Sequence, residues 1–245
     1  MRFDVYFSTA AFEGVDVGDR WVAVIDVLRA GTSIAYALMN GAKAVLPTDS
    51  SEEALRIVGN LPREDVVLCG ERGGMPIPGF EVGNSPREFT PDLVKGKTVV
   101  MTTSNGTEGL VRSGLGERLV APALVNLDLA ADFLAPRIRG NGLAVLCCGS
   151  EGRLALEDVL CAGMLVGRLE AALEQSARGN DGLLVALTIA RRFGTEVEEV
   201  ILATDHGREL AAMGMEEDVR VCAQLSTMEV LPVGKDGRLV SAKEL

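Results

Sequence analysis

The strongest constraint on the fold is the alternation of short apolar runs with segments of helical periodicity. Runs such as WVAVIDVL and GLAVLCCG are almost wholly apolar, which is typical of strands buried between two layers of helices. Strands are predicted over 2–7, 21–28, 42–48, 65–70, 97–103, 117–124 and 142–149. Helices are predicted over 31–42, 51–59, 127–139, 154–178, 183–193, 196–203 and 205–213, with another beginning near 105. The tail adds strand-like runs at 218–225, 228–234 and 237–242.

This order of elements predicts an α/β fold. A strand–helix rhythm of this kind is typical of a three-layer α/β/α architecture with a mostly parallel or mixed central sheet. No linker, repeat or low-complexity segment interrupts the 245 residues. We therefore expect a single domain over 1–245, which could divide into two lobes near residue 125.

Charge and residue usage narrow the classes of function. The formal net charge is −11 and no basic stripe is present, which argues against nucleic acid as a partner. No apolar run approaches the roughly 18 residues that span a bilayer, and the first residues lack the apolar core of a secretory signal. We expect a cytoplasmic protein with no membrane partner. The single histidine, His206, excludes two-histidine phosphatase chemistry and multi-histidine metal sites.

Ligands of open α/β sheets bind at the carboxyl ends of the strands, and four loops after predicted strands are unusual. In VIDVLRAGTSI, Asp26 lies near the end of an apolar strand, where an acid is costly unless it is paired or binds a metal. Arg29 follows, and Thr32 stands at the start of a predicted helix, whose N-terminus favours an anion. A purely structural interpretation pairs Asp26 with Arg29 and makes Thr32 an N-cap.

The second loop, GERGGMPIPGFEVGNSPREF, is too long and too charged to be a plain turn. Glu71 and Arg72 follow a strand directly, and the next two glycines permit close approach of the backbone to a ligand. Asn84 and Ser85 resemble the start of a helix. Loops above about 12–15 residues are usually functional or disordered, and the apolar residues in this one argue against disorder.

The third and fourth loops also combine polar groups with a helix start. In TTSNGT (102–107), hydroxyl and amide groups converge as they do in sites for phosphate, sulfonate or carboxylate, although capping alone would use the same residues. In CCGSEGRLALED, Glu157 and Asp158 fall in the first turns of a helix, where acids are also favourable on charge grounds. Carboxylates without histidines suit a hard cation such as Mg²⁺, so the residues predict metal-assisted phosphoryl chemistry.

Together, the blocks VIDVLRAGTSI, GERGG with GF and GNSP, TTSNGT, and CCGSEG with LEDVLCAG resemble the 2-phosphosulfolactate phosphatase family. The resemblance covers nearly the whole chain, with the blocks in the same order. It implies a Mg²⁺-dependent phosphatase of α/β/α fold that releases phosphate from 2-phospho-3-sulfolactate to give 3-sulfolactate, on a route to coenzyme M. The partner is then a small anionic substrate that carries a phosphate, a carboxylate and a sulfonate.

Carried onto this sequence, the resemblance assigns roles to the residues of the four loops. Asp26, Glu71, Glu157 and Asp158 become candidates for Mg²⁺ binding or acid–base work, with Arg29 as a further catalytic candidate. The candidates for substrate binding are Arg29, Thr32, Arg72, Asn84, Ser85, Thr102, Thr103, Ser104, Asn105, Gly106 and Thr107. Either Asp26 attacks phosphorus to form an aspartyl-phosphate, or a metal-bound water attacks it.

Several alternatives stay open from the sequence alone. The substrate could be another phosphorylated 2-hydroxy acid, because such phosphatases can share one site. Cys147 and Arg153 fit the C-x5-R spacing of cysteine-dependent phosphatases. A non-catalytic protein could bind small anions through the same loops. A homodimer is a plausible assembly.

Overall fold

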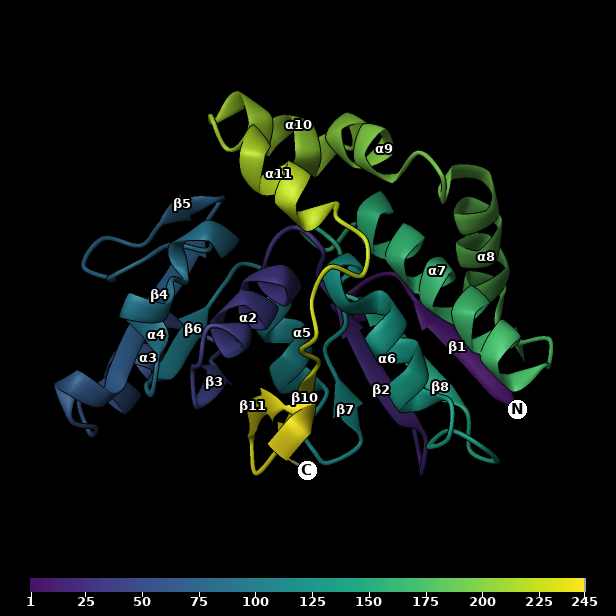
Figure 1. The fold of residues 1–245 in the computed structure, drawn as a ribbon, viewed down its shortest axis with the longest axis horizontal. Helices are drawn as coiled ribbons and strands as arrows, with labels where there is room; N and C mark the ends of the chain where they lie inside the picture. The colour runs from purple at the N-terminus through teal and green to yellow at the C-terminus, as the bar shows by residue number, and fades with distance from the viewer. Residues whose placement is uncertain (245) are drawn as a thin grey trace.

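The computed structural model describes residues 1–244, and within them eleven strands form one sheet with helices on both faces (Figure 1). The order across the sheet is β5-β4-β6-β3-β11-β10-β7-β2-β8-β1-β9. This confirms the predicted three-layer α/β/α architecture with a mixed sheet. The single domain and its division near residue 125 stay predictions.

The strands pair mainly in parallel. Their bounds are β1 (Arg2–Tyr6), β2 (Trp21–Ile25), β3 (Ala44–Pro47), β4 (Val66–Arg72), β5 (Met75–Pro76), β6 (Thr98–Thr102), β7 (Leu119–Val120), β8 (Leu143–Cys147), β9 (Arg178–Gly179), β10 (Pro232–Lys235) and β11 (Arg238–Ser241). Strand β2 is parallel to β7 and β8, and β6 is parallel to β3 and β4. The antiparallel hairpin β10–β11 joins these two groups, because β10 pairs with β7 and β11 pairs with β3.

The predicted helices are present, the short helices α1 and α4 were not predicted, and one predicted strand near the C-terminus is a helix. They are α1 (Thr9–Phe12), α2 (Ala30–Met39), α3 (Ser51–Val58), α4 (Pro91–Val94), α5 (Gly106–Arg112), α6 (Leu127–Leu134), α7 (Leu156–Leu173), α8 (Asp181–Phe193), α9 (Val197–Ala203), α10 (Asp205–Ala212) and α11 (Glu216–Cys222). The predicted strand over 218–225 was wrong, because α11 occupies most of it. Three acids in the first turn stabilise this helix, and Val219 and Cys222 place its apolar side against the core.

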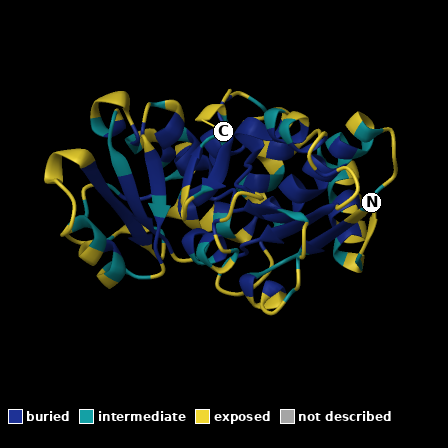
Figure 2. Ribbon diagram, turned by 90° about the horizontal axis from the view of Figure 1, so that it is seen from below, coloured by how far each residue is buried: buried dark blue, intermediate teal, exposed yellow. Residues whose placement is uncertain are grey.

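Alternate residues of the central strands supply two separate cores. In β2, Ala23 and Ile25 pack in one cluster, with residues of α6, α7 and α8. Val22 and Val24 face the other side of the sheet and pack in the second cluster, with residues of α1, α2 and α5. Figure 2 shows the consequence: the strands are buried and the exposed residues lie on the outer helices and loops. Because successive side chains of a strand point to opposite faces of the sheet, each central strand contributes apolar residues to both cores.

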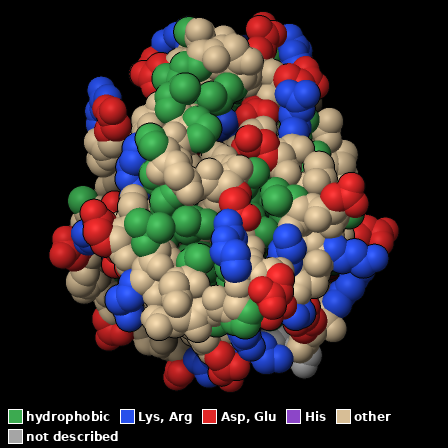
Figure 3. All heavy atoms as spheres, turned by 90° about the vertical axis from the view of Figure 1, so that its left-hand side faces the viewer, with side chains coloured by type: hydrophobic (Ala, Val, Ile, Leu, Met, Phe, Trp, Pro, Cys, Tyr) green, Lys and Arg blue, Asp and Glu red, His purple; other side chains and the backbone are tan. Residues whose placement is uncertain are grey.

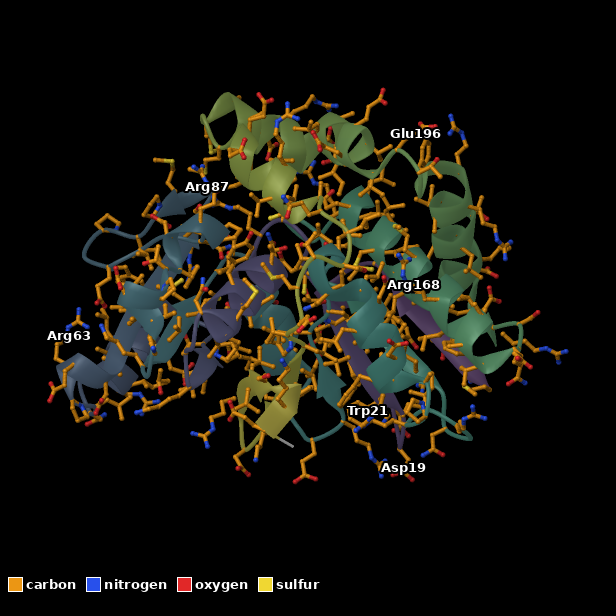
Figure 4. The ribbon with its side chains drawn as sticks, in the orientation of Figure 1. Asp19, Trp21, Arg63, Arg87, Arg168 and Glu196 are labelled. Carbon is orange, nitrogen blue, oxygen red and sulfur yellow. The ribbon has the colours of Figure 1, made fainter. Side chains whose placement is uncertain are left out.

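The position of the site follows from the direction of these strands. Asp19 and Trp21, at the amino end of β2, lie on the opposite side of the molecule from α9, α10 and α11 (Figure 4). These three helices therefore lie over the carboxyl ends of the parallel strands (Figure 1). These helices follow α8 in the chain. Residues of the C-terminal part of the sequence therefore cover loops that come earlier in it.

The surface mixes charged and apolar side chains. On the face that carries β5, acidic and basic groups alternate with apolar ones (Figure 3). Within residues 1–244, each helix is too short or too polar to cross a bilayer.

Candidate active site

A polar groove lies beneath α10, where the loops after β2, β4, β6 and β8 meet. One half has a volume of about 310 Å³ and is lined by residues from each of these loops, among them Asp26, Glu71 and Ser104. The other half, of about 300 Å³, is lined by Glu157 and by residues of α9 and α10. The two halves share Ser150, Glu151, His206 and Glu209. They form one continuous groove at the edge of the sheet that the sequence predicted.

Asp26 is the first residue after β2, and it is only 8% exposed. Its Oδ1 accepts a hydrogen bond from the N–H of Ala30 at 3.0 Å. Its Oδ2 lies against Gly106, where a Cβ would approach that oxygen to 2.5 Å. Residue 106 must therefore be glycine if the helix α5 is to pack this closely on the carboxylate.

The acids of the groove repel one another. Burial, together with the charges of Glu71 and Glu157, raises the pKa of Asp26 to about 7, although His206 acts in the opposite direction. Burial and the charges of Asp26 and Glu157 also raise the pKa of Asp158 well above its usual range. These carboxyl groups therefore cannot all carry a charge near neutral pH without a compensating cation.

Glu157 is 1% exposed, yet neither of its carboxylate oxygens has a hydrogen-bond partner in the described chain. The Nδ1 of His206 lies 3.4 Å from its Oε1, which is an ion-pair distance without the geometry of a hydrogen bond. Burial lowers the pKa of His206, but Glu157 and Asp26 outweigh this effect and the net shift is upward. Because a buried carboxylate with two unused oxygens is costly, Glu157 has capacity to bind a ligand.

Asp158, beside Glu157 on α7, uses both of its oxygens within the protein. Its Oδ1 accepts from the N–H of Val27 at 2.8 Å, and its Oδ2 accepts from the N–H of Gly149 at 3.0 Å. Asp158 therefore ties the loop after β2 to the loop after β8. The sequence predicted the same roles for Glu157 and Asp158. In the structure, Glu157 has unused carboxylate oxygens, whereas Asp158 holds two loops together.

Glu71 has a similar connecting role between the loops after β4 and β6. Its Oε2 accepts from the N–H of Gly74 at 2.8 Å, and its Oε1 accepts from the N–H of Ser104 at 2.7 Å. The hydroxyl of Ser104 lies 3.3 Å from Oε2 as a further donor. Glu71 thus lines the groove while it fixes the backbone of both neighbouring loops.

The carboxylates differ in their fitness for a metal ion. Across residues 1–244, no group of three or more acidic, histidine or cysteine side chains is arranged to hold a metal by itself. Glu157 has two unused oxygens, and Asp26 has one oxygen outside its hydrogen bond to the backbone. Mg²⁺ commonly binds through one or two carboxylates and keeps several waters and substrate oxygens. Asp26 and Glu157 fit Mg²⁺ in this manner.

Arg29 does not pair with Asp26, so that structural interpretation was wrong. Its Nη1 lies 2.8 Å from Oδ2 of Asp218, and its Nη2 donates to the carbonyl of Gly74 at 2.8 Å. Arg87 approaches the other oxygen of Asp218 to 3.9 Å, from the segment beside α11 (Figure 4). Arg29 therefore lies in the groove wall, held between α11 and the loop after β4.

The remaining candidates of the first two loops have different surroundings. The amide oxygen of Asn84 is buried without a hydrogen-bond partner, and Asn84 lines the groove. The hydroxyl of Ser85 instead donates to Oδ1 of Asp218 at 2.7 Å. Thr32 is completely buried and donates to the carbonyl of Val27 at 3.2 Å. Thr32 therefore supports α2 from within and is out of reach of a ligand, which corrects its assignment to substrate binding.

Capping explains part of the TTSNGT segment. Thr103 and Thr107 cap each other, because the hydroxyl of each accepts from the N–H of the other, at 3.1 and 2.9 Å. Asn105 accepts from the N–H of Glu151 at 3.1 Å and so joins the loops after β6 and β8. Thr103, Ser104 and Asn105 still line the groove, whereas Thr107 is completely buried.

Thr102 and Arg72 form a pair at the ends of β6 and β4. The Nη2 of Arg72 donates to the hydroxyl of Thr102 at 2.9 Å. Thr102 is completely buried, so its hydroxyl orients Arg72 and does not face the groove. Arg72 itself is exposed beside Thr103 and Ser104.

The cysteine-dependent alternative is wrong for this chain. Cys147 is completely buried at the end of β8, and burial raises the pKa of its thiol well above its usual range. The side chain of Arg153 is 76% exposed and pairs with Glu151 at 2.7 Å. A neutral buried thiol and an arginine that points to solvent cannot provide the nucleophile and the anion site of that mechanism.

The sequence missed several residues of the groove and its walls. His206 and Glu209 lie on α10 and line both halves, and Asp218 on α11 holds Arg29. The one available signal was that His206 is the sole histidine. Its segment follows no predicted strand, so strand-end reasoning could not bring it to the site.

Known proteins are similar to this chain over most of its length. A family model described as "2-phosphosulpholactate phosphatase" matches residues 7–237. A protein of Symbiobacterium thermophilum is 37% identical over 225 residues, which cover 92% of this chain and 95% of that protein. One of Deinococcus radiodurans is 41% identical over 223 residues, covering 91% and 90%, and one of Caldanaerobacter subterraneus subsp. tengcongensis is 31% identical over 237 residues, covering 97% of each. All three carry the name "Probable 2-phosphosulfolactate phosphatase".

The match extends through every loop of the groove. Residues 7–237 include each strand end from β2 to β8 and the helices α9 to α11 that cover them. These three relatives, each above 30% identity, align over at least nine-tenths of both chains. The chain therefore belongs to the 2-phosphosulpholactate phosphatase family.

Proposed function

We propose that the chain is a Mg²⁺-dependent phosphatase that hydrolyses 2-phospho-3-sulfolactate to 3-sulfolactate and inorganic phosphate, a step on a route to coenzyme M. Membership of the family and the names of the relatives support the substrate. The single observation that carries the proposal is Glu157, a buried carboxylate with two unused oxygens in the same groove as Asp26. Such an arrangement is unfavourable in the protein alone and becomes favourable when a cation binds.

In this reaction a water oxygen adds to phosphorus, the bond between phosphorus and the C2 oxygen breaks, and the leaving oxygen takes a proton. Mg²⁺, when bound, would offset the charge of the phosphoryl oxygens and make water more acidic. Asp26 and Glu157 would hold the ion. The pKa of about 7 belongs to Asp26 without a cation, and a cation held by this carboxylate would lower that pKa, so that Asp26 would be ionised at neutral pH.

Other groups of the groove orient the substrate. Ser104 and Asn105 present polar groups along one wall, and Asp218 fixes the guanidinium of Arg29 in the same wall. His206 lies between the two halves of the groove and, when protonated, offsets the negative charge of Glu157. A direct attack by Asp26 on phosphorus remains the alternative route. The stereochemistry at phosphorus separates the two, because attack by water inverts the phosphoryl group once, whereas attack by Asp26 followed by water inverts it twice and so retains its configuration.

The test is phosphate release from a panel of phosphorylated 2-hydroxy acids, with Mg²⁺ and with a chelator. We expect turnover of 2-phosphosulfolactate that chelation abolishes and added Mg²⁺ restores. Glu157→Gln should require more Mg²⁺ for half-maximal activity, while Glu170→Gln, on the same helix, serves as the control. Failure of the wild-type protein to release phosphate from any member of the panel would overturn the proposal.

The same assay addresses the remaining expectations. A protein that only binds anions would show ligand binding without phosphate release, and preference for another phosphorylated 2-hydroxy acid would appear directly in the panel. The cytoplasmic location and the homodimer stay predictions.

A further inference from the structure

A second polar cavity adjoins the groove. It has a volume of about 470 Å³, and we call it the side cavity; it is lined by Asp49, Arg72, Thr103, Ser104, Glu108 and Arg112. Thr103 and Ser104 also line the groove, so the two spaces meet at these residues. A ligand whose reacting group lies near Asp26 can therefore extend a second group past Ser104 into the side cavity.

The arginines around these spaces differ in whether an acid already neutralises them. Three have acidic partners: Arg29 pairs with Asp218, Arg112 with Glu108, and Arg153 with Glu151. Arg72 forms no ion pair with an acid anywhere in residues 1–244. It is therefore the arginine of the side cavity whose charge is available to an anion.

Neutral groups hold Arg72 in a fixed orientation. Its Nη2 donates to the hydroxyl of Thr102 at 2.9 Å, and its Nη1 donates to the carbonyl of Glu71 at 2.8 Å. Two of the five guanidinium N–H groups are used in this way, so three remain for a ligand. Because neither partner is charged, the full positive charge of Arg72 persists, and the side chain is ordered before a ligand arrives.

We propose that Arg72 in the side cavity binds the sulfonate of the substrate and so selects sulfonated over unsubstituted 2-phospho-hydroxy acids. The inference rests on the proposed function. In 2-phosphosulfolactate the carboxylate is attached to the carbon that carries the phosphate, whereas the sulfonate is one carbon further away. The sulfonate is thus the group with the reach to pass Ser104 while the phosphate stays in the groove. The acidic residues of the side cavity do not prevent the sulfonate from binding, because Glu108 pairs with Arg112 and Asp49 is exposed to solvent.

The test compares three substrates in the wild type, Arg72→Met and Arg72→Lys, all with Mg²⁺. They are 2-phosphosulfolactate, 2-phospholactate, which lacks the sulfonate, and 2-(phosphooxy)propane-1-sulfonate, which lacks the carboxylate. In Arg72→Met we expect kcat/KM to fall roughly 10- to 100-fold for both sulfonated substrates, mainly through KM. The value for 2-phospholactate should stay within about twofold of the wild type, and Arg72→Lys should recover part of the loss because it keeps the charge.

The control is Arg118→Met, another exposed arginine, which pairs with Asp19 at the amino end of β2 and should not change the selectivity. Thermal unfolding of each variant shows whether the fold is kept. If 2-phospholactate is turned over too slowly, inhibition constants replace the rates: that of 3-sulfolactate should rise in Arg72→Met and that of lactate should not.

The outcomes separate this inference from the proposed function. An equal fall for all three substrates would mean that Arg72 serves the phosphate or supports Glu71, and it would overturn the inference. A fall restricted to the two carboxylated substrates would assign Arg72 to the carboxylate and overturn it as well. If the wild type hydrolyses none of the three, the proposed function itself fails and the inference fails with it.

Discussion

The guanidinium of Arg29 and the carboxylate of Asp218 lie 2.8 Å apart, with both side chains at most 4% exposed. This ion pair joins the loop after β2 to α11, two segments almost 190 residues apart in the chain. A buried pair of this kind contributes little net stability, but the loss of one partner leaves an uncompensated charge.

We therefore expect Asp218→Asn to lower the free energy of unfolding by about 3–5 kcal/mol and to reduce phosphatase activity, because Arg29 loses its position in the groove wall. The double variant Arg29→Met/Asp218→Leu should recover most of the stability without recovering the activity. Urea denaturation and phosphate release, measured on the same samples, check both statements. Recovery of activity in the double variant would show that Arg29 is only structural.

We expect the buried carboxyl group of Asp26 to lower the stability of the folded protein at neutral pH and to be required for activity. Its pKa is raised from 3.8 to about 7 in the folded protein, so the folded state binds this proton more tightly than the unfolded chain does. Its contribution to stability is thus full below about pH 4 and is lost as the pH rises through 7. Asp26→Asn should lower kcat by about 10²–10⁴-fold and, with a chelator present, unfold at a higher temperature than the wild type above pH 7.

The pH series provides the control for this prediction. The difference in unfolding temperature between Asp26→Asn and the wild type should grow from pH 4 to 7 and then level off. A difference that is constant over this range would show that the carboxyl group titrates normally. Asp236→Asn, at an exposed turn, should show no such trend.

Gly106 should not tolerate a methyl group. A Cβ there would lie 2.5 Å from both Asp26 Oδ2 and the Ala30 Cβ; the Ala30 Cβ is fixed to the backbone, and the buried Asp26 carboxylate is held by the N–H of Ala30. Gly106→Ala should cost about 1–3 kcal/mol of stability and displace Asp26, with a loss of activity. Gly167→Ala is the control, because nothing lies within 4 Å of its Cβ position in α7, and it should stabilise by about 1 kcal/mol. Calorimetry measures the stability of both variants, and phosphate release measures their activity.

The cysteines should be inert in the native protein. All five are buried, and burial raises the pKa of each thiol, that of Cys222 to about 12. Iodoacetamide at pH 8 should leave the native protein unlabelled and fully active, and should label every cysteine after unfolding. Mass spectrometry of both samples checks this. Loss of activity together with one label on Cys147 would revive the cysteine-dependent mechanism.

The sequence predicted the sheet well because its strands are nearly continuous apolar runs, whose burial on both faces leaves little ambiguity. It also predicted that the loops at Asp26, Glu71 and Ser104 would meet, since carboxyl ends of parallel strands lie at one edge. The groups of α10 and α11 could not be placed in this way. A helix that packs over a site after three or four intervening helices leaves no local pattern in the sequence.

Individual roles were harder to predict than positions. Glu157 and Asp158 are neighbours of the same charge type, and only the backbone N–H groups near Asp158 distinguish them. Thr32 stands where a capping residue beside a binding site would be expected. Its hydroxyl instead donates a hydrogen bond to the carbonyl of Val27. Such differences arise from tertiary packing, which the spacing of residues in the sequence does not reveal.

The hairpin β10–β11 has a consequence for the order in which the protein can be completed during synthesis. It lies in the middle of the sheet, between β7 and β3, although the ribosome produces it after all the other strands of this sheet. Until it emerges, the two groups of parallel strands share no backbone hydrogen bonds across the sheet. The nascent chain therefore carries two half-sheets with open inner edges, and a chain that ends before Pro232 would keep them exposed to pairing with other chains.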